Sequence, residues 1–202
     1  MLAGGASSRF GSDKAMARVA GQPLLARLCA MLSEVTSVVG IIGDREKYGA
    51  FGVSCIPDQW PGEGPLGGVI TALDASACNT ATQAPTPTWN LIVGCDMPFL
   101  TLEWLTFLVQ RAFASSSDVV VPESRHAMEP LCACWRSHAN TKLRQAFDRG
   151  TRKVSEAMKH LRVEILDETQ WKRFDSAGRL FWNMNTRADY EEARRLVEPE
   201  RP

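Results

Sequence analysis

Short apolar strands alternate with helices along the first 122 residues, and this alternation limits the possible folds more than any other feature of the chain. Buried strands, rich in β-branched residues and bounded by Gly, Pro or Asp, are predicted over 38–43, 53–58, 90–96 and 118–122. Helices are predicted over 23–32, 66–75 and 102–113. Thr101 has the position of an N-cap for the third helix, with Glu103 in its first turn. The pattern predicts a three-layer α/β fold, with a mostly parallel central sheet and helices on both faces.

After residue 122 the alternation is less regular. Strands are predicted over 129–135 and 162–167, and helices over 139–149 and 154–161. Thr186 and Asp189 have the spacing of a capping box, which predicts that the last helix begins here. The polar, proline-bearing stretch 77–88 is expected to be a long surface loop. With no internal repeat and no break in composition, we expect a single domain over residues 1–202.

The charge balance argues against one large class of partners. Lys plus Arg and Asp plus Glu number 23 each, so the formal net charge is zero, whereas nucleic-acid binding usually needs a basic surface. No apolar run approaches the roughly 20 residues of a membrane span. The first motif begins at residue 2, so we expect no signal peptide before it. We therefore expect partners other than nucleic acid or membrane.

The six cysteines indicate a reducing compartment. None forms a C-x-x-C pair, and a chain this long and apolar does not need a disulfide framework, so we expect reduced core cysteines in a cytoplasmic protein. Cys132 and Cys134 should point to one face of a strand, with Ala133 on the other.

The first motif that could carry chemistry is LAGGASSRFGSDK, at residues 2–14. Its glycines allow backbone N–H groups to face an anion at close range, and Arg9 and Lys14 add positive charge suited to phosphates. The spacing is not that of a P-loop. The alternative is a glycine-rich N-terminal loop with incidental charges.

A second glycine motif, GEGPLGG at 62–68, matches G-x-G-x-x-G literally. The dinucleotide fingerprint should directly follow a strand, but Gln59, Trp60 and Pro61 intervene and Pro65 interrupts the motif. A glycine loop at a helix N-terminus, able to approach a sugar or phosphate, fits this context better.

Polar residues follow the predicted strands. Asp96 stands in CDMPF, residues 95–99, directly after the apolar run 91–94 of the predicted strand 90–96. A carboxylate at this end of a strand can hold Mg²⁺, and Asp58 follows its own strand in the same way. Asn183 and Asn185 place two amides just before the last helix. The alternative for each is a turn or cap residue. The three histidines are isolated in sequence, and no His–Cys metal cage is apparent.

Taken together and in this order, LAGG-x-S-x-R-F-G-x-D-K, G-P-L-G-G, C-D-M-P-F and N-M-N-T resemble the molybdenum cofactor guanylyltransferases. The resemblance extends over residues 2–186. It implies the Rossmann-like fold of the nucleotide-diphospho-sugar transferases, with a nucleotide-binding half over 1–122 and an acceptor-binding half over 123–202. It also implies that molybdopterin attacks the α-phosphorus of GTP, with pyrophosphate as the second product and Mg²⁺ as cofactor. Molybdoenzyme apo-proteins or their chaperones are then the expected protein partners.

The resemblance also implies roles for single residues. The implied GTP contacts are Leu2, Ala3, Gly4, Gly5, Lys14, Asp58 and Asp96. The implied catalytic residues are Arg9, Lys14 and Asp96, with Asp96 as the Mg²⁺ ligand, and the implied acceptor contacts are Gly64, Gly68, Asn183 and Asn185. The attacking phosphate is already ionised at neutral pH, so electrostatics and positioning can supply the catalysis without a general base.

Two positions depart from the family pattern. An asparagine often contacts the nucleotide after the second strand, but Ile42 or Gly43 stands there, and no role is transferred to either. The family's first strand also has several apolar residues before the loop, whereas only Met1 and Leu2 precede it here, so we expect a shortened first strand, through a late start or truncation.

Four alternatives remain open at this point. The first is a cytidylyltransferase acting on the same pterin, but these enzymes tend to have two alanines before a single glycine, where this chain has Ala3-Gly4-Gly5. The second is a sugar-phosphate nucleotidyltransferase, which usually has Gly-Thr-Arg where Ser7-Ser8-Arg9 stands. The other two are a nucleotide-binding protein that delivers the cofactor without turnover, and a Rossmann dehydrogenase.

Overall fold

Seven strands form a mixed sheet at the centre of the computed structural model, which describes residues 1–4, 13–79, 89–125 and 127–197, without the side chains of 78 and 79. One part of the sheet has the order β5-β4-β1 with parallel pairs, and the other has the order β6-β8-β7-β9. A parallel bridge from Leu2 to Gly94 joins the two parts between β1 and the end of β6. The strands of this sheet are β1 (Leu2–Ala3), β4 (Gly40–Gly43), β5 (Ser54–Ile56), β6 (Trp89–Val93), β7 (Val119–Pro122), β8 (Cys132–Arg136) and β9 (Val163–Leu166). Two further strands, β2 (Arg18–Val19) and β3 (Gln22–Pro23), form a separate antiparallel hairpin.

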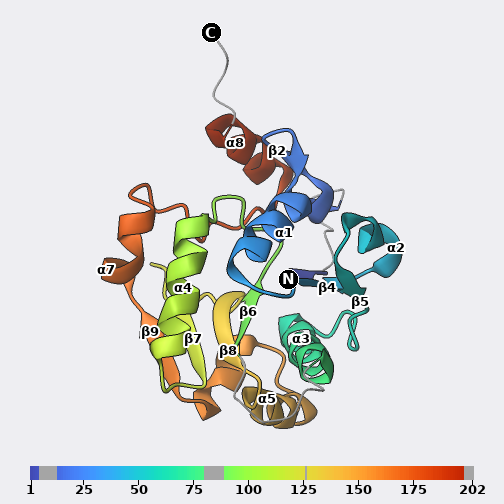
Figure 1. Ribbon diagram of the computed structural model, residues 1–202, viewed down its shortest axis with the longest axis vertical. Helices are drawn as coiled ribbons and strands as arrows, with labels where there is room; N and C mark the ends of the chain where they lie inside the picture. Colours follow the sequence, from blue (N-terminus) through green and yellow to red (C-terminus); the bar gives the residue numbers. More distant parts are fainter. Residues whose placement is uncertain (5–12, 80–88, 126, 198–202) are drawn as a thin grey trace.

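Helices cover both faces of this sheet, as the sequence predicts (Figure 1). On one face α1 packs against α4, and on the other α3 packs against α5. The α-helices are α1 (Leu24–Val35), α2 (Arg45–Tyr48), α3 (Pro65–Asn79), α4 (Leu102–Ala114), α5 (Ala139–Asp148), α6 (Val154–Ala157), α7 (Glu168–Trp171) and α8 (Arg187–Val197). The 3₁₀ turns are η1 (Lys14–Met16), η2 (Gly49–Phe51), η3 (Met158–His160) and η4 (Lys172–Phe174). None of the described helices is long and apolar enough to cross a membrane.

Each core strand sends alternate side chains into two separate apolar clusters, because side chains alternate across a sheet. In β8, Cys132 and Cys134 pack in the cluster under α1 and α4, while Ala133 and Trp135 pack in the cluster under α3 and α5. The predicted facing of the two cysteines is therefore confirmed. The cysteines whose side chains the structure describes are all free thiols: Cys29, Cys55, Cys95, Cys132 and Cys134.

The predicted N-cap of α4 is also confirmed. Thr101 Oγ1 accepts a hydrogen bond from Trp104 N at 3.2 Å, and Glu103 lies in the first turn, where its charge favours the positive end of the helix. Trp104 is fully buried and contacts Phe107, Phe174 and Phe181.

Several element boundaries differ from the sequence prediction. β8 begins at Cys132 rather than 129, because Cys132 N closes a turn onto Glu129 O at 2.9 Å. The predicted helix 154–161 is two short pieces, α6 and η3. The predicted loop 77–88 begins as helix, since α3 continues to Asn79, and its residues 80–88 lie outside the described residues. The β2–β3 hairpin, α2 and α7 were not predicted.

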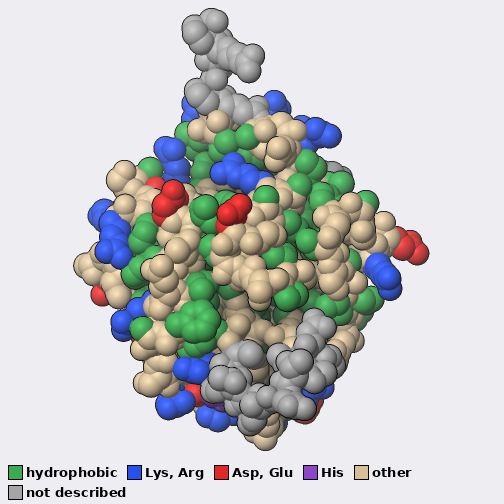
Figure 2. Space-filling model, viewed as in Figure 1, with side chains coloured by type: hydrophobic (Ala, Val, Ile, Leu, Met, Phe, Trp, Pro, Cys, Tyr) green, Lys and Arg blue, Asp and Glu red, His purple; other side chains and the backbone are tan. Residues whose placement is uncertain are grey.

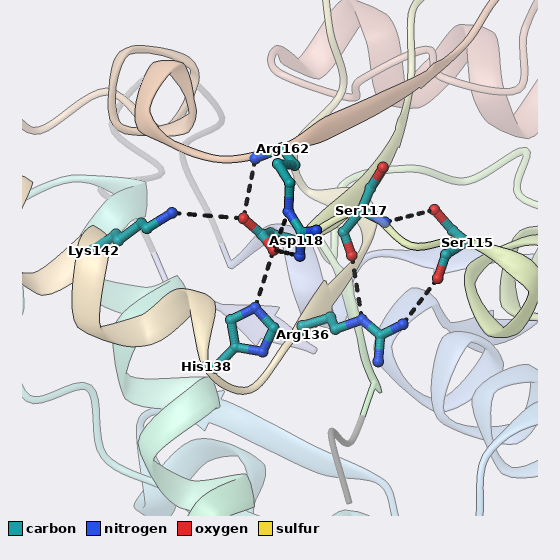
Figure 3. Close-up of polar contacts among 7 residues, drawn as sticks. All are labelled: Ser115, Ser117, Asp118, Arg136, His138, Lys142 and Arg162. Carbon is teal, nitrogen blue, oxygen red and sulfur yellow. Dashed lines mark hydrogen bonds and ion pairs between the residues drawn. The ribbon is translucent and has the colours of Figure 1, made fainter.

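At the amino end of β7, the buried carboxylate of Asp118 connects this strand to α5 and to the start of β9 (Figure 3). The side chain of Asp118 is 3% exposed, and it accepts hydrogen bonds from Arg162 N, Nε and Nη2 at 3.1, 3.2 and 2.7 Å. His138 Nε2 lies 3.0 Å from Asp118 Oδ1, and Lys142 Nζ lies 3.7 Å from Oδ2. Burial alone disfavours the charged form, but the hydrogen bonds from Arg162 and His138 hold the pKa of Asp118 far below its usual range.

Candidate active site

The carboxyl ends of the parallel strands β1, β4, β5 and β6 meet along one edge of the sheet. Leu2 pairs with Ile42 and Ala3 with Gly43, while Leu2 also bridges to Gly94. In open α/β sheets this edge is where ligands bind, because the strand ends and the helix N-termini converge there. The residues that follow the strands at this edge include Gly4, Asp58 and Asp96.

β1 and β4 approach each other closely because residue 43 is glycine. A Cβ at Gly43 would lie 2.5 Å from Ala3 O, a distance that real Cβ atoms essentially never show, and 3.0 Å from the Tyr48 ring, which is also tight. Ile42, beside it, is 4% exposed and packs in the apolar cluster under α3 and α5. Neither residue therefore has a polar side chain that could replace the asparagine of the family pattern.

Asp96 lies three residues beyond Val93, where β6 ends. The backbone around it is fixed, since Cys95 N donates to Leu2 O at 3.0 Å and Asp96 O accepts from Met184 N at 2.8 Å. The carboxylate folds over Gly94, because a Cβ there would lie 2.9 Å from Asp96 Oδ1. Burial raises the pKa of Asp96, and the positive charge of Lys14 opposes that rise. Asp96 is thus a partly desolvated carboxylate beside a cation.

Lys14 begins the 3₁₀ turn η1, which follows the first glycine motif. Asp13 caps this turn, with its Oδ1 accepting from Ala15 N at 3.0 Å. Lys14 Nζ donates to Asn185 Oδ1 at 2.9 Å, a contact between residues 171 positions apart in the chain. The structure therefore brings the first and the last sequence motif together, beside Asp96.

The segment that carries Asn183 and Asn185 is held by the start of α8. Asp189 Oδ2 accepts from Asn185 N and Thr186 N at 2.7 and 2.6 Å, and Asp189 N donates to Thr186 Oγ1 at 3.2 Å. The predicted capping box is thus confirmed. Burial alone would raise the pKa of Asp189, but these two N–H donors lower it below its usual range. Asn183 is half-buried, with Nδ2 donating to Phe181 O at 3.3 Å.

Asp58 follows β5 and is oriented by α3. Its Oδ1 accepts from Trp60 N at 3.0 Å and from Thr71 Oγ1 at 3.1 Å, and Thr71 is fully buried on α3. Thr71 Oγ1 also accepts from Gln59 N at 3.2 Å. The carboxylate is therefore fixed against the first turns of this helix.

The second glycine motif contains two different kinds of glycine. Gly62 and Gly64 have φ angles of +83° and +91°, a conformation that side chains rarely adopt, and both are exposed just before α3 begins. Gly68 is buried inside α3, where a Cβ would lie 3.4 Å from Leu2 Cδ1. Gly68 therefore lets α3 pack closely on β1, and the acceptor contact that the resemblance implies for it stays a prediction.

The remaining expected residues differ in their accessibility. Leu2 and Ala3 have buried side chains, so only their backbone is available to a nucleotide, whereas Gly4 is exposed. Gly5 and Arg9 lie outside the described residues. Sequence reasoning missed Asp13, Tyr48 and Thr71, which orient predicted site residues, although Asp13 stands within the quoted D-K motif.

Within the described part of the chain, no group of three or more His, Cys, Asp or Glu side chains could hold a metal by itself. A cation that shares its coordination between one carboxylate and the phosphates of a substrate needs no such group, and Mg²⁺ is commonly bound this way. The donor at this edge that suits it is Asp96, a hard oxygen ligand whose charged form burial disfavours and a cation would favour.

Charged groups of both signs are scattered over the surface. On the face viewed in Figure 2, basic and acidic side chains lie among apolar and polar ones, with the basic side chains spread rather than joined into one stripe.

Comparison with known proteins identifies the family. The model of the MobA-like NTP transferase domain matches residues 1–164. A probable molybdenum cofactor guanylyltransferase of Chloroflexus aggregans is 32% identical over 94% of this chain and 89% of its own length. The molybdenum cofactor guanylyltransferase of Rhodopseudomonas palustris is 30% identical over 98% of this chain and 92% of its own.

Solved structures share the fold. Molybdopterin-guanine dinucleotide biosynthesis protein A of Archaeoglobus fulgidus has a TM-score of 0.78 at 23% identity, covering 98% of this chain and 97% of that one. A 4-diphosphocytidyl-2C-methyl-D-erythritol synthase from Anaerococcus prevotii has a TM-score of 0.66 at 10% identity, covering 98% and 95%. The fold is thus the nucleotidyltransferase fold predicted from the sequence. The chain belongs to the MobA-like NTP transferase family and, within it, to the molybdenum cofactor guanylyltransferases.

Proposed function

We propose that this chain transfers the GMP group of GTP to molybdopterin and releases pyrophosphate. An oxygen of the molybdopterin phosphate forms a bond to the α-phosphorus of GTP, and the bond from that phosphorus to the oxygen of pyrophosphate breaks. The observation that carries this proposal is the 2.9 Å contact between Lys14 and Asn185 beside Asp96. It joins the motif expected on the nucleotide to the motif expected on the pterin, as a reaction between two bound substrates requires.

The residues at the sheet edge suit this chemistry. The attacking phosphate monoester has its second pKa near 6, so it is already ionised at neutral pH and needs no general base. The demand on the protein is to hold two polyanions together and to balance charge on the departing pyrophosphate. Lys14 supplies positive charge there, and we assign the same role to Arg9.

We assign substrate contacts from the family resemblance and, for the described residues, from their place at this edge. The proposed contacts to GTP are made by the backbone of Leu2, Ala3, Gly4 and Gly5 and by the side chains of Lys14, Asp58 and Asp96. The proposed contacts to the pterin are made by Gly64, Gly68, Asn183 and Asn185. In support, Asp58 and Asp96 each follow a parallel strand, and Asn185 lies within hydrogen-bond distance of Lys14.

We propose Asp96 as the protein ligand of Mg²⁺. Its single, partly desolvated carboxylate fits a cation that is otherwise bound by phosphates and water. When bound, Mg²⁺ would supply positive charge that balances the negative charge of the nucleotide phosphates. The part of this chain is then to fix the Asp96 backbone, through Cys95 N on Leu2 O and Met184 N on Asp96 O.

We further propose a single domain over 1–202, with the nucleotide half at 1–122 and the acceptor half at 123–202. The insertion of β8, from the second half, between β6 and β7 of the first supports one folding unit. Apo-molybdoenzymes or their chaperones remain the predicted protein partners.

A pyrophosphate-release assay tests the function. Purified protein is mixed with molybdopterin and with GTP, CTP or ATP in turn, and we expect release that requires molybdopterin and is fastest with GTP. Lys14→Ala should lower kcat/KM by about 10²-fold or more, as expected for loss of one electrostatic contact in the transition state. The matched control is Lys47→Ala, which removes an exposed lysine from α2. Release that is independent of molybdopterin, or equal rates for Lys14→Ala and wild type, would contradict the proposal.

A further inference from the structure

Tyr48 connects α2 to the turn that carries Lys14. It is the last residue of α2 and only 5% exposed, and its hydroxyl donates to Asp13 Oδ2 at 2.6 Å. The other oxygen, Asp13 Oδ1, accepts from Ala15 N at 3.0 Å. The two oxygens of one carboxylate thus join the cap of η1 to a residue 35 positions further along the chain.

The position of the Tyr48 hydroxyl is set by the sheet. The aromatic ring fills the space beside Gly43, where a Cβ would lie 3.0 Å from ring atom Cε2, and Gly43 pairs with Ala3 of the central strand β1. At the other end of α2, Asp44 Oδ1 accepts from Glu46 N at 2.9 Å. The position of the phenol is therefore fixed by its packing against the end of β4.

The turn η1 depends on such a fixed point. It has three residues, and the backbone bonds that close it are Met16 N to Asp13 O at 3.2 Å and Ala17 N to Lys14 O at 3.1 Å. So short a 3₁₀ turn has little stability of its own, because hydrogen bonds in 3₁₀ geometry are poor and too few to offset the lost chain entropy. Buried Ala15 holds its inner side, and Asp13 holds its start.

Lys14 directly follows Asp13, so the orientation of the cap determines where the ammonium group lies. In this structure the ammonium contacts Asn185 and acts electrostatically on Asp96. We propose that Tyr48 is a positioning residue, which through Asp13 fixes η1 so that Lys14 meets the nucleotide phosphates beside Asp96. This inference rests on the proposed function for the identity of the nucleotide, and it adds residues that the sequence motifs did not assign.

The test separates the hydroxyl from the ring. Tyr48→Phe keeps the packing on Gly43 and removes only the hydrogen bond to Asp13. Calorimetric titration with GTP and Mg²⁺ measures the dissociation constant, and the pyrophosphate assay measures kcat. We expect GTP affinity and kcat/KM to fall about tenfold, since small misplacements of a positioned group commonly cost 10- to 100-fold. The matched control is Tyr190→Phe, at the other tyrosine of the chain, whose hydroxyl donates to Arg18 O at 3.1 Å. This variant should bind GTP as wild type does.

A double-mutant cycle distinguishes positioning from general destabilisation. If Tyr48 acts through Asp13, then Asp13→Ala should give a loss at least as large, and adding Tyr48→Phe to it should change GTP affinity by less than twofold. Asp13→Asn should retain most of the affinity, because its amide can still cap η1 and still bond the Tyr48 oxygen. Asp13→Ala also keeps the test valid if Tyr48→Phe folds poorly.

Two results would overturn the inference. One is that Tyr48→Phe binds GTP within twofold as tightly as Tyr190→Phe does. The other is that the losses of GTP affinity from Tyr48→Phe and Asp13→Ala multiply in the double variant, because the two residues would then act independently. A wild-type protein that binds GTP but releases no pyrophosphate with molybdopterin would instead contradict the proposed function, while the GTP titrations would still decide the role of Tyr48.

Discussion

Replacing Asp118 by asparagine should destabilise the protein, although this residue lies at the amino end of β7, away from the candidate active site. The Asp118 carboxylate accepts from the backbone N–H and the guanidinium of Arg162 and lies next to His138 and Lys142. Asparagine keeps the size and one carbonyl oxygen, so it can still accept from Arg162 N. It replaces the other oxygen with an NH₂ group, which faces donors instead of accepting from them.

The expected magnitude follows from these contacts. A hydrogen bond to a charged group contributes about 1.5–3 kcal/mol, and two link Asp118 to the guanidinium. The Arg162 side chain is 67% exposed, so water replaces much of what it loses, whereas the Asp118 side chain is 3% exposed and has no such compensation. We therefore expect a loss of about 2–3 kcal/mol at pH 7, close to one full charged hydrogen bond.

The pH dependence has a defined sign. The pKa of Asp118 is far lower in the folded protein than the value of about 3.9 expected when unfolded. The unfolded chain therefore takes up a proton on acidification before the folded protein does, so this stabilisation is complete above about pH 5 and is lost progressively below it. The variant has no carboxylate here, so the stability difference between it and wild type should shrink as the pH falls from 5 to 3.

Urea unfolding followed by tryptophan fluorescence at pH 7, 5, 4 and 3.5 measures both effects. Asp148→Asn, at an exposed aspartate that ends α5, serves as the control for changing one formal charge. A difference below about 0.5 kcal/mol at pH 7, or a difference that stays constant down to pH 3.5, would refute the reasoning.

Three further predictions concern the candidate active site. Asp96→Asn should lower kcat by about 10²–10³-fold and raise the Mg²⁺ concentration that the enzyme requires, while circular dichroism shows an intact fold. If the variant has wild-type kinetics across a Mg²⁺ titration, Asp96 is not the metal ligand. Gly43→Ala should lower the free energy of unfolding, measured in urea, by roughly 1–3 kcal/mol, because its Cβ would lie 2.5 Å from Ala3 O. The control Gly49→Ala, whose Cβ would meet nothing closer than 3.9 Å, should change it by less than 1 kcal/mol, and equal effects would contradict the prediction. The kcat/KM for GTP should exceed that for CTP, because the glycines of the first motif leave room for a purine, and equal values would count against the guanylyl assignment.

The sequence predicted those features that depend on local pattern. The helix α4 was predicted with its Thr101 cap because capping and apolar spacing are both short-range signals. The opposite facing of Cys132 and Ala133 followed from strand alternation alone. Asp96 was expected beyond the carboxyl end of an apolar strand, and it does follow β6, although β6 ends at Val93 and not at 96 as predicted.

Other features depend on contacts that no local pattern reveals. The contact of Tyr48 with Asp13 joins residues 35 apart, and the contact of Arg162 with Asp118 joins residues 44 apart, with no spacing rule to relate them. The β2–β3 hairpin has strands of two residues each, too short for a periodic signal, and turns through Ala20 at φ +53°. The packing of Gly68 against the side chain of Leu2 also joins residues far apart in the chain, which the loop-like pattern of its motif does not reveal.

The position of β8 between β6 and β7 has a consequence for how the chain is made. On the ribosome, β6 and β7 emerge before their shared neighbour, so neither can complete its pairing on that side until residue 136 has left the exit tunnel. Until then each leaves a row of backbone N–H and C=O groups open to another nascent chain. A fragment that stops at residue 122 would keep this gap permanently, and it should associate or aggregate unless a peptide with the sequence of β8 is supplied in trans.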